Sequence, residues 1–192
     1  MHPSPVASFV SSGGAAVDVP LTGSPDAEAI FREYAPYVHR VLRHLGVASE
    51  DIDDVMQDVF IVVHRKVADF EPRGSLRAWV HGIAIRVTSR HRRRRSRVRE
   101  TAKGDALDAI DPRTPAETLD AQDARRILAG ILDQLDDDKR AVFVLYELEE
   151  LSMQEVAEAA EIPLQTAYSR LRAARELVYE AVRRHQAREN FR

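Results

Sequence analysis

Hydrophobic residues recur at every third or fourth position along most of this chain, and no stretch alternates with period two for long. That spacing is typical of amphipathic helices, so the pattern predicts an all-α fold. The expected helices cover residues 26–45, 51–67, 75–95 and about 116–134, with another beginning at the acidic triplet 136–138. Pro36 lies inside the first helix and should kink it or split it in two, because proline lacks the N–H that an inner helical position needs.

Two further helices, joined by a tight turn, are expected within residues 152–188. Ser152 and Glu155 have the spacing of a capping box at the first helix start. Pro163 ends that helix, and the second begins at about Leu164. A short helix, a turn and a helix with a polar outer face is the layout of a helix-turn-helix, whose second helix enters a DNA major groove. The alternative is a helical hairpin packed in an all-α core.

Two stretches lack helical periodicity. Residues 1–25 are rich in Pro, Ser, Gly and Ala and are expected to form a disordered tail. Residues 101–115 contain Gly, Pro and scattered acids and are expected to form a flexible linker. The sequence therefore predicts two small helical domains, 26–100 and 116–190.

Charge is divided unevenly along the chain, although the net charge is only -3. From Arg86 to Arg99 there are eight arginines and no acid, whereas residues 135–161 hold nine acids and two bases. Opposite charge blocks indicate at least two partner surfaces. After Val87 no apolar face remains, so this helix end is expected to project into solvent or onto a polyanion such as nucleic-acid phosphates.

The helix at 51–67 has a second face of a different character. Asp54, Gln57 and Asp58 lie opposite its hydrophobic stripe, together with Ile61. A single exposed isoleucine often has no function. Flanked by acids, this one favours a contact with a basic protein partner.

Other classes of protein find little support. The absence of cysteine fits a reducing cytoplasm, and no apolar run approaches the ~20 residues that span a bilayer. The N-terminus does not resemble a signal peptide. Asp54 and Asp58 could hold Mg²⁺ only with carboxylates from another helix, and no matching pair is found. The histidines lack metal-site spacing and no phosphate-binding glycine loop is present, so we expect no enzyme, metal or cofactor.

Two long motifs resemble one family. DIDDVMQDVFIVVHRKVADFEPRGSLRAWVHGIAIR, residues 51–86, is similar to sigma region 2, and LDQLDDDKRAVFVLYELEELSMQEVAEAAEIPLQTAYSRLRAAR, residues 132–175, is similar to sigma region 4. Together they resemble a sigma factor of the sigma-70 family, in the extracytoplasmic function (ECF) group. The order of the motifs, with a linker and no domain between them, makes the resemblance specific.

The resemblance implies a cytoplasmic subunit of RNA polymerase that selects promoters. Its partners would be the clamp and flap of core RNA polymerase, promoter DNA and an anti-sigma factor. Contact with the core polymerase would come from Asp54, Gln57, Asp58 and Ile61. Contact with the -10 element would come from Arg86, Arg90, Arg92, Arg93, Arg94 and Arg95. Contact with the -35 element would come from Gln165, Thr166, Tyr168, Ser169, Arg172 and Ala173.

Four positions depart from the family pattern. Arg86 stands where the family usually has Asn, near a -10 base, and Arg90 stands where an acid is usual. Glu161 replaces the usual glycine of the helix-turn-helix turn, and Tyr168 replaces a common Lys or Arg. The competing interpretation is a helix-turn-helix regulator that is not a polymerase subunit. Binding to core polymerase separates the two, since a sigma factor must bind it.

Overall fold

The computed structural model describes residues 26–70, 75–101 and 119–189, and within these ranges the regular structure is helical. The expected all-α fold is therefore confirmed. The expected tail, 1–25, and nearly all of the expected linker, 101–115, lie outside the described residues.

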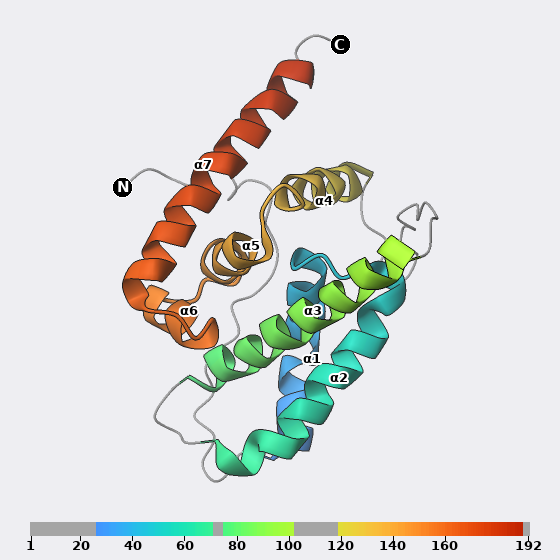
Figure 1. The fold of residues 1–192 in the computed structure, drawn as a ribbon, viewed down its shortest axis with the longest axis vertical. Coiled ribbons are helices and arrows are strands. Elements are labelled where there is room, and N and C mark those ends of the chain that lie inside the picture. The colour runs from blue at the N-terminus through green and yellow to red at the C-terminus, as the bar shows by residue number, and fades with distance from the viewer. Residues whose placement is uncertain (1–25, 71–74, 102–118, 190–192) are drawn as a thin grey trace.

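The N-terminal half is a three-helix unit, shown in blue to green in Figure 1. Helix α1 covers Ala27–His44, α2 covers Ile52–Lys66 and α3 covers Leu76–Thr101, with single 3-10 turns at Ser49–Asp51 and Val67–Asp69. Their apolar faces enclose one core, in which the following side chains are buried: Ile30, Tyr34, Val38, Leu42, Val47, Ile52, Val55, Val59, Val63, Leu76, Val80, Ile83 and Ala84.

Helix α1 is not split at Pro36, contrary to one of the two expected outcomes. Ile30, Tyr34 and Val38 lie on both sides of the proline and are all buried in the same core. Burying each such side chain contributes about 1.5–3 kcal/mol, which offsets the hydrogen bond that proline removes. Gly46, the residue after the expected helix 26–45, has φ +81 and ends the helix.

The C-terminal half contains the remaining helices. Helix α4 covers Leu119–Leu132, α5 covers Asp137–Phe143, a π-helical turn covers Val144–Leu148, α6 covers Met153–Ala159 and α7 covers Leu164–Glu189. Asp136 caps α5 by accepting from the backbone N–H of Lys139 at 2.8 Å. Helix α7 extends well beyond the body of the molecule (Figure 1). None of the helices in the described ranges has the length and apolar content to cross a bilayer.

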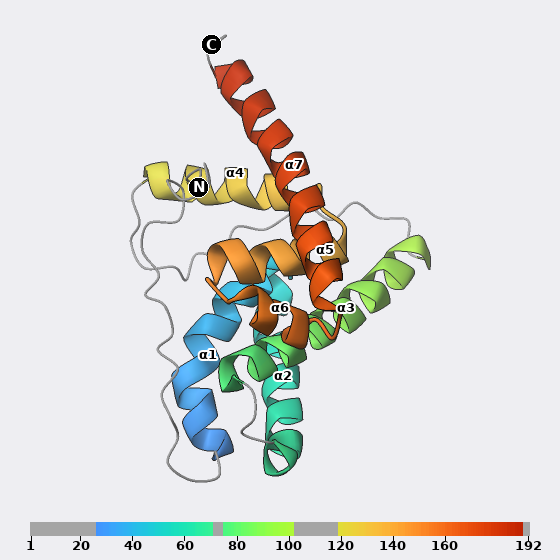
Figure 2. The same ribbon diagram turned by 90° about the vertical axis from the view of Figure 1, so that its left-hand side faces the viewer.

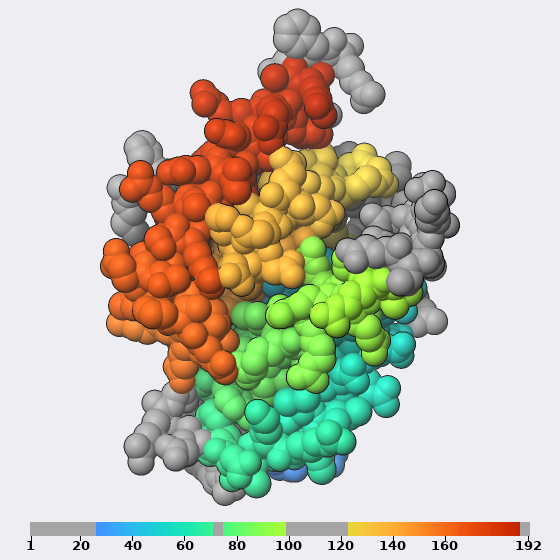
Figure 3. All heavy atoms as spheres, viewed as in Figure 1, coloured from blue at the N-terminus to red at the C-terminus, as the bar shows by residue number. Residues whose placement is uncertain are grey.

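The two halves pack against each other. Helix α6 lies along α3, and the π-helical turn contacts α1; Figure 2 shows α6 beside α3. In Figure 3 the green atoms of α3 directly adjoin the yellow and orange atoms of the C-terminal half. Val41, Leu45 and Ala78 belong to the N-terminal half by sequence but are buried in the C-terminal core. The contact between the halves is thus an apolar one at its centre.

Two hydrophobic side chains that follow the helical spacing of apolar residues, and would therefore be expected in a core, are exposed. Phe31 is 47% exposed and Leu164 is 40% exposed. Phe31 is next to the buried Ile30 but points to the edge of the core, where its ring packs against Phe60. Leu164 is the first residue of α7, ahead of the first buried turn.

Candidate nucleic-acid and protein interfaces

The two helices and tight turn predicted within residues 152–188 are present, and the first begins with the expected cap. The Ser152 hydroxyl accepts a hydrogen bond from the backbone N–H of Glu155 at 3.3 Å. In return the Glu155 carboxylate accepts from the backbone N–H of Ser152 at 2.8 Å. The capping box is complete, so the orphan N–H groups at this helix start are satisfied locally.

The turn after α6 has the hydrogen bonds of a Schellman motif. The Ile162 N–H donates to the Ala157 carbonyl at 3.0 Å and the Glu161 N–H donates to the Glu158 carbonyl at 3.1 Å. Glu161 has φ +54, the left-handed conformation that glycine adopts most easily. For an L-residue this conformation costs roughly 1–2 kcal/mol. The missing family glycine therefore leaves the turn geometry intact but strained.

Helix α7 presents the six residues expected to contact a -35 element on its outer side. Gln165, Tyr168, Ser169 and Arg172 are exposed, and Thr166 and Ala173 are partly exposed. Tyr168 is 52% exposed, which is high for a tyrosine beside a core. The Ser169 hydroxyl donates to the Thr166 carbonyl at 2.9 Å. These residues are available to a partner, and their contact with DNA stays a prediction.

Arg172 is the one long cationic side chain among those six. It donates from Nε to Glu176 at 3.2 Å, one helical turn away. An exposed pair at this spacing contributes about 0.3–0.5 kcal/mol, whereas a bidentate contact to guanine is worth about 1–3 kcal/mol. The pair orients Arg172 without preventing it from reaching a base.

The inner side of α7 fixes the helix from behind. Ala167, Leu171, Ala174 and Val178 are buried against the C-terminal core. Two ion pairs flank this seam, from Arg170 to Asp138 and from Arg175 to Glu147, each at 2.6 Å. The Arg175 guanidinium also lies over the Tyr146 ring, at 5.4 Å from its centroid. The outer face of α7 is consequently preformed.

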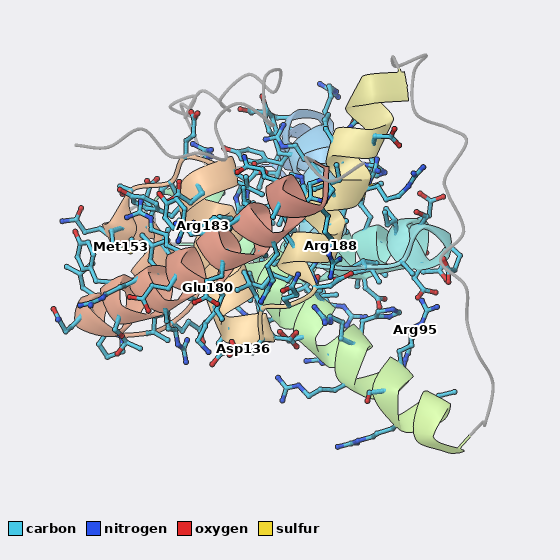
Figure 4. All side chains as sticks on the ribbon, turned by 90° about the horizontal axis from the view of Figure 1, so that it is seen from above. Arg95, Asp136, Met153, Glu180, Arg183 and Arg188 are labelled. Atoms are coloured by element: carbon cyan, nitrogen blue, oxygen red, sulfur yellow. The ribbon has the colours of Figure 1, made fainter. Side chains whose placement is uncertain are left out.

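The arginine segment of α3 is less free than the sequence suggested. Thr88 is buried, and Arg92 and Arg95 are only partly exposed. Arg95 pairs with Glu50 at 2.6 Å and also with Asp51. Its side chain is labelled on α3 in Figure 4, where Glu180, Arg183 and Arg188 mark the C-terminal part of α7. The expectation that this helix end has no packed face is therefore wrong in part.

Arg92 is held by both halves of the molecule. It donates to the Leu45 carbonyl at 2.9 Å and pairs with Asp137 at 3.0 Å. The other arginines expected at a -10 element, Arg86, Arg90, Arg93 and Arg94, are exposed. Of these, Arg86 reaches across to the strained turn, where it pairs with Glu161 at 2.5 Å. Two departures from the family pattern, Arg86 and Glu161, thus form one ion pair.

The acidic face of α2 has the exposure that the sequence predicts. Asp54, Gln57, Asp58 and Ile61 are all exposed, and Ile61 is 40% exposed. A groove runs beside them, and its apolar lining comes from Phe31, Met56, Phe60 and Ile61. Phe31 and Phe60 pack edge to face with ring centroids 4.7 Å apart. Asp53, Gln57, His64 and Arg65 complete the lining, so the groove is suited to a partner with an apolar surface, with the exposed acids Asp54 and Asp58 elsewhere on the same helix.

A buried charge cluster between the halves was not identified from the sequence. Glu149 follows the π-helical turn and its side chain is fully buried. Its carboxylate accepts from Arg40 Nε at 2.9 Å and from Arg40 Nη2 at 2.6 Å. Its backbone carbonyl accepts from Arg77 of α3. His44 and His81 have ring nitrogens 3.8 and 4.0 Å from the carboxylate.

This cluster shifts the titration of its members. Burial alone would raise the pKa of Glu149, but the two hydrogen bonds and the positive charge of Arg40 hold that pKa below its ordinary value of 4.5. Burial lowers the pKa of His81 below 6.5, so its imidazole is neutral at pH 7. Its Nδ1–H donates to the Arg77 carbonyl at 2.7 Å. The carboxylate is therefore ionised and is balanced mainly by Arg40.

A second buried charge also lies at the contact between the halves. Arg140 of α5 is 1% exposed and donates to the carbonyl of His44, the last residue of α1, at 2.6 Å. It also pairs with Asp133 at 2.6 Å. A Cβ on Gly46 would lie 2.6 Å from the Arg140 guanidinium. Arg40 of the N-terminal half thus contacts Glu149 of the C-terminal half, and Arg140 of the C-terminal half contacts the His44 carbonyl of the N-terminal half.

Two family models match this chain, one in each helical half. The family model described as Sigma-70 region 2 matches residues 30–98, and the one described as Sigma-70, region 4 matches residues 125–178. Together they match more than half of the chain, and the chain belongs to the sigma-70 family, in its ECF group.

The relatives support the same group. The chain is 29% identical over 163 residues to the ECF RNA polymerase sigma factor SigE of Mycolicibacterium smegmatis. This aligned region covers 84% of this chain and 63% of that protein. It is 26% identical over 153 residues to the ECF RNA polymerase sigma-E factor of Escherichia coli, covering 74% of this chain and 80% of that one. The chain thus spans less than two thirds of the first relative.

Two solved structures share the fold. One is the sigma factor RpoE in complex with the anti-sigma factor NepR from Bartonella quintana, with a TM-score of 0.67 and 23% identity over 81% of this chain and 96% of that one. The other is CnrH in complex with the cytosolic domain of CnrY, with a TM-score of 0.60 and 22% identity over 81% of this chain and 86% of that one. At these identities the likeness concerns the fold.

Proposed function

We propose that this protein is a sigma factor that binds core RNA polymerase and directs it to -10 and -35 promoter elements for transcription initiation. The observation that carries the proposal is the outer face of α7: Gln165, Tyr168, Ser169 and Arg172 are exposed on a helix whose inner side is fixed in a core. A helix presented in this way is suited to a major groove.

The two halves divide the work in this proposal. Residues 26–100 bind the polymerase clamp and the -10 element, and residues 116–190 bind the -35 element and the flap. Residues 101–115 link them, and residues 1–25 are a tail without an assigned role. The protein works in the cytoplasm, where its polymerase is, and neither catalysis nor a cofactor forms part of the function.

The polymerase contact lies on α2. Asp54, Gln57, Asp58 and Ile61 form an exposed face beside the apolar groove that contains Phe31. Removing one partner of a buried charge pair at such an interface lowers the binding free energy by about 2–5 kcal/mol. We also propose an anti-sigma factor as regulator, because both solved structures described above are complexes with one or with a cytosolic partner domain.

Transcription with core polymerase on a genomic library tests the proposal. The protein should direct core polymerase to start sites that core alone does not use. Asp58→Arg should weaken binding to core polymerase without changing helix content, whereas Asp69→Arg, an exposed acid in the same half, should not.

Two results would count against it. Failure of core polymerase to use any promoter better with the protein than without it would reject the sigma-factor function and favour a regulator that binds DNA alone. Unchanged core affinity in both Asp54→Arg and Asp58→Arg would reject the assignment of this face.

A further inference from the structure

The apolar groove beside α2 has the size and exposure of a binding site. Its volume is about 570 Å³, within the range of about 300–1,000 Å³ that is typical of clefts holding a ligand. Phe31 and Ile61, two of the residues that line it, are 47% and 40% exposed, although both are large apolar side chains. Apolar side chains that gather at one exposed surface indicate a site for a binding partner.

The groove lies close to the point where the chain enters the fold. Phe31 is the fifth residue of α1, which begins at Ala27, and its ring packs against Phe60 of α2. Figures 1 and 2 both show the first turn of α1 and the last turn of α2 at the same end of the three-helix unit. At 1.5 Å per residue, Phe31 is only about 6 Å along the helix axis from Ala27. Residues 1–25 therefore join the fold beside the groove.

One short stretch of those residues has the pattern that an apolar groove needs. Val17, Val19 and Leu21 alternate with Asp18 and Pro20. Because successive side chains of an extended chain point to opposite faces, the three apolar side chains would share one face. Pro20 favours this conformation, since proline disfavours the helical region for the residue before it.

The same stretch is within reach of the groove. The five residues from Leu21 to Asp26 span at most about 17 Å, and the lining of α2 extends over residues 53–65, which is about 18 Å of helix. The other apolar cluster before α1, Phe9 and Val10, consists of adjacent residues. An extended chain points these two to opposite faces, so they match the groove less well.

Charge agrees with this occupant. Asp18 is the only Asp, Glu, Lys or Arg among residues 1–25, and Arg65 lies exposed at the groove. In an extended chain Asp18 points away from the apolar face, where it can meet a basic side chain at the rim. Exposed ion pairs contribute little affinity, so this pair would orient the segment while the apolar side chains bind it.

We propose that residues 17–21 dock in extended form into this groove, with their apolar face against Phe31 and Phe60. The short connection to α1 makes the contact intramolecular, with an effective concentration in the millimolar range, so that even a weak contact is populated. Gln57 and Ile61 line the groove and also belong to the face that we assign to core polymerase. The docked segment and the polymerase therefore exclude each other. The docking stands on the groove alone, whereas the competition rests on the proposed function.

A spin label tests the docking in the full chain. The chain has no cysteine, so Ala16→Cys provides a single attachment point, and its three methionines give few methyl signals. A nitroxide at position 16 should broaden the methyl signal of Met56, which lines the groove. The methyl signal of Met153, which is buried in the C-terminal core, is the internal reference and should be broadened far less.

A substitution in the docked stretch should remove most of that broadening. Val19→Asp places a carboxylate against the apolar lining, and a charge without a partner is unfavourable there. Val10→Asp is the matched control, because it makes the same change before α1 but outside the docked stretch; it should leave the broadening of Met56 as in the wild type. Circular dichroism should show equal helix content in all three proteins.

Binding to core polymerase gives a second readout. The apparent affinity of a protein is reduced by the fraction of molecules that are not competent to bind. For an effective concentration of about 1 mM and an intrinsic dissociation constant of about 0.1–1 mM, the segment occupies about half to nine tenths of the grooves. Val19→Asp should therefore bind core polymerase about twofold to tenfold more tightly than the wild type. Val10→Asp should bind like the wild type.

The outcomes separate the docking from the function. Equal broadening of Met56 in the wild type and Val19→Asp overturns the docking, as does a Met56 signal that only core polymerase perturbs, since polymerase is then the occupant of the groove. Equal affinity of the wild type and Val19→Asp for polymerase overturns the competition. Loss of broadening in Val19→Asp, together with no binding of polymerase by any of the three proteins, supports the docking and rejects the sigma-factor function.

Discussion

The two surfaces assigned to DNA are held in opposite ways. On α7 the ion pairs of Arg170 and Arg175 lie behind the helix and leave its outer face open. On α3 the ion pairs involve the very arginines that we assign to DNA, since Arg92 and Arg95 pair with acids of the same chain. The first surface is ready for a ligand, whereas the second must exchange internal partners for external ones. Basic residues that look alike in the sequence can therefore differ in whether they are free to bind an external ligand.

The largest effect is expected at the joint between the two surfaces. Arg40→Gln leaves the buried Glu149 without its main partner, which typically costs 3–5 kcal/mol; because the Arg40 side chain is 30% exposed, we expect about 3 kcal/mol. Urea unfolding of the wild type and the variant at pH 7 measures the difference. Equal free energies of unfolding would show that Glu149 has another partner.

Acidification should remove the same difference. The pKa of Glu149 is lowered in the folded protein, so its contribution to stability is present above its ordinary value of 4.5 and is lost as pH falls through the lower folded value. The free energies of wild type and Arg40→Gln should converge below pH 4.5. A constant difference between pH 7 and pH 3.5 would contradict this linkage.

The next effect is expected on the preformed surface. We expect the -35 element to contain a guanine that Arg172 contacts through O6 and N7. Arg172→Ala should cost roughly 1–3 kcal/mol on the preferred site and relax the preference at one position. Selection of -35 sequences with the wild type and the variant in parallel provides the measurement.

Gln165→Ala is the matched control for that selection, since this residue near the helix start should contact backbone more than bases. Its loss should weaken all sequences alike. If Arg172→Ala and the wild type select the same sequences, Arg172 contacts a phosphate and the guanine assignment is wrong.

The arginines of α3 should divide into two classes. Arg93 and Arg94 are exposed, so changing both to Gln should lower the slope of log affinity against log salt by about 0.7–0.9 per lost phosphate contact, with little change in stability. Arg95→Gln should also lower the free energy of unfolding, because its pairs with Glu50 and Asp51 are lost. An unchanged slope in the double variant would show that these arginines are solvated and do not contact phosphates.

The smallest effect is expected at the turn that joins both surfaces. Glu161→Gly should relieve the left-handed strain of roughly 1–2 kcal/mol but lose an exposed pair with Arg86 worth about 0–1 kcal/mol. The net result should be a stabilisation of up to about 2 kcal/mol, measured by thermal unfolding beside Glu158→Gly, which should destabilise α6. Loss of stability in Glu161→Gly would show that the ion pair outweighs the strain.

Local patterns in the sequence account for the elements of the fold. The capping box of Ser152 and Glu155 and the helix end at Gly46 follow from spacing alone. The sequence could not reveal the pair of Arg40 and Glu149, because residues 109 positions apart leave no periodic signal. The exposure of Asp58 and Arg172 could be predicted, because it depends only on the face of their own helix. The partial burial of Arg92 could not, because it depends on Asp137 in the other half of the chain.

Helix α7 is a single rod of 26 residues, about 39 Å long at 1.5 Å per residue. Its first turns carry the residues assigned to the groove, and its last turns carry Arg183 and Arg188, which follow Val182, the last buried residue of the helix (Figure 4). The helix is packed on the C-terminal core from Ala167 to Val182, so it moves together with that core, and a tilt of about 10° at the groove moves its far end by about 7 Å. The docking angle on DNA therefore sets where that basic end lies.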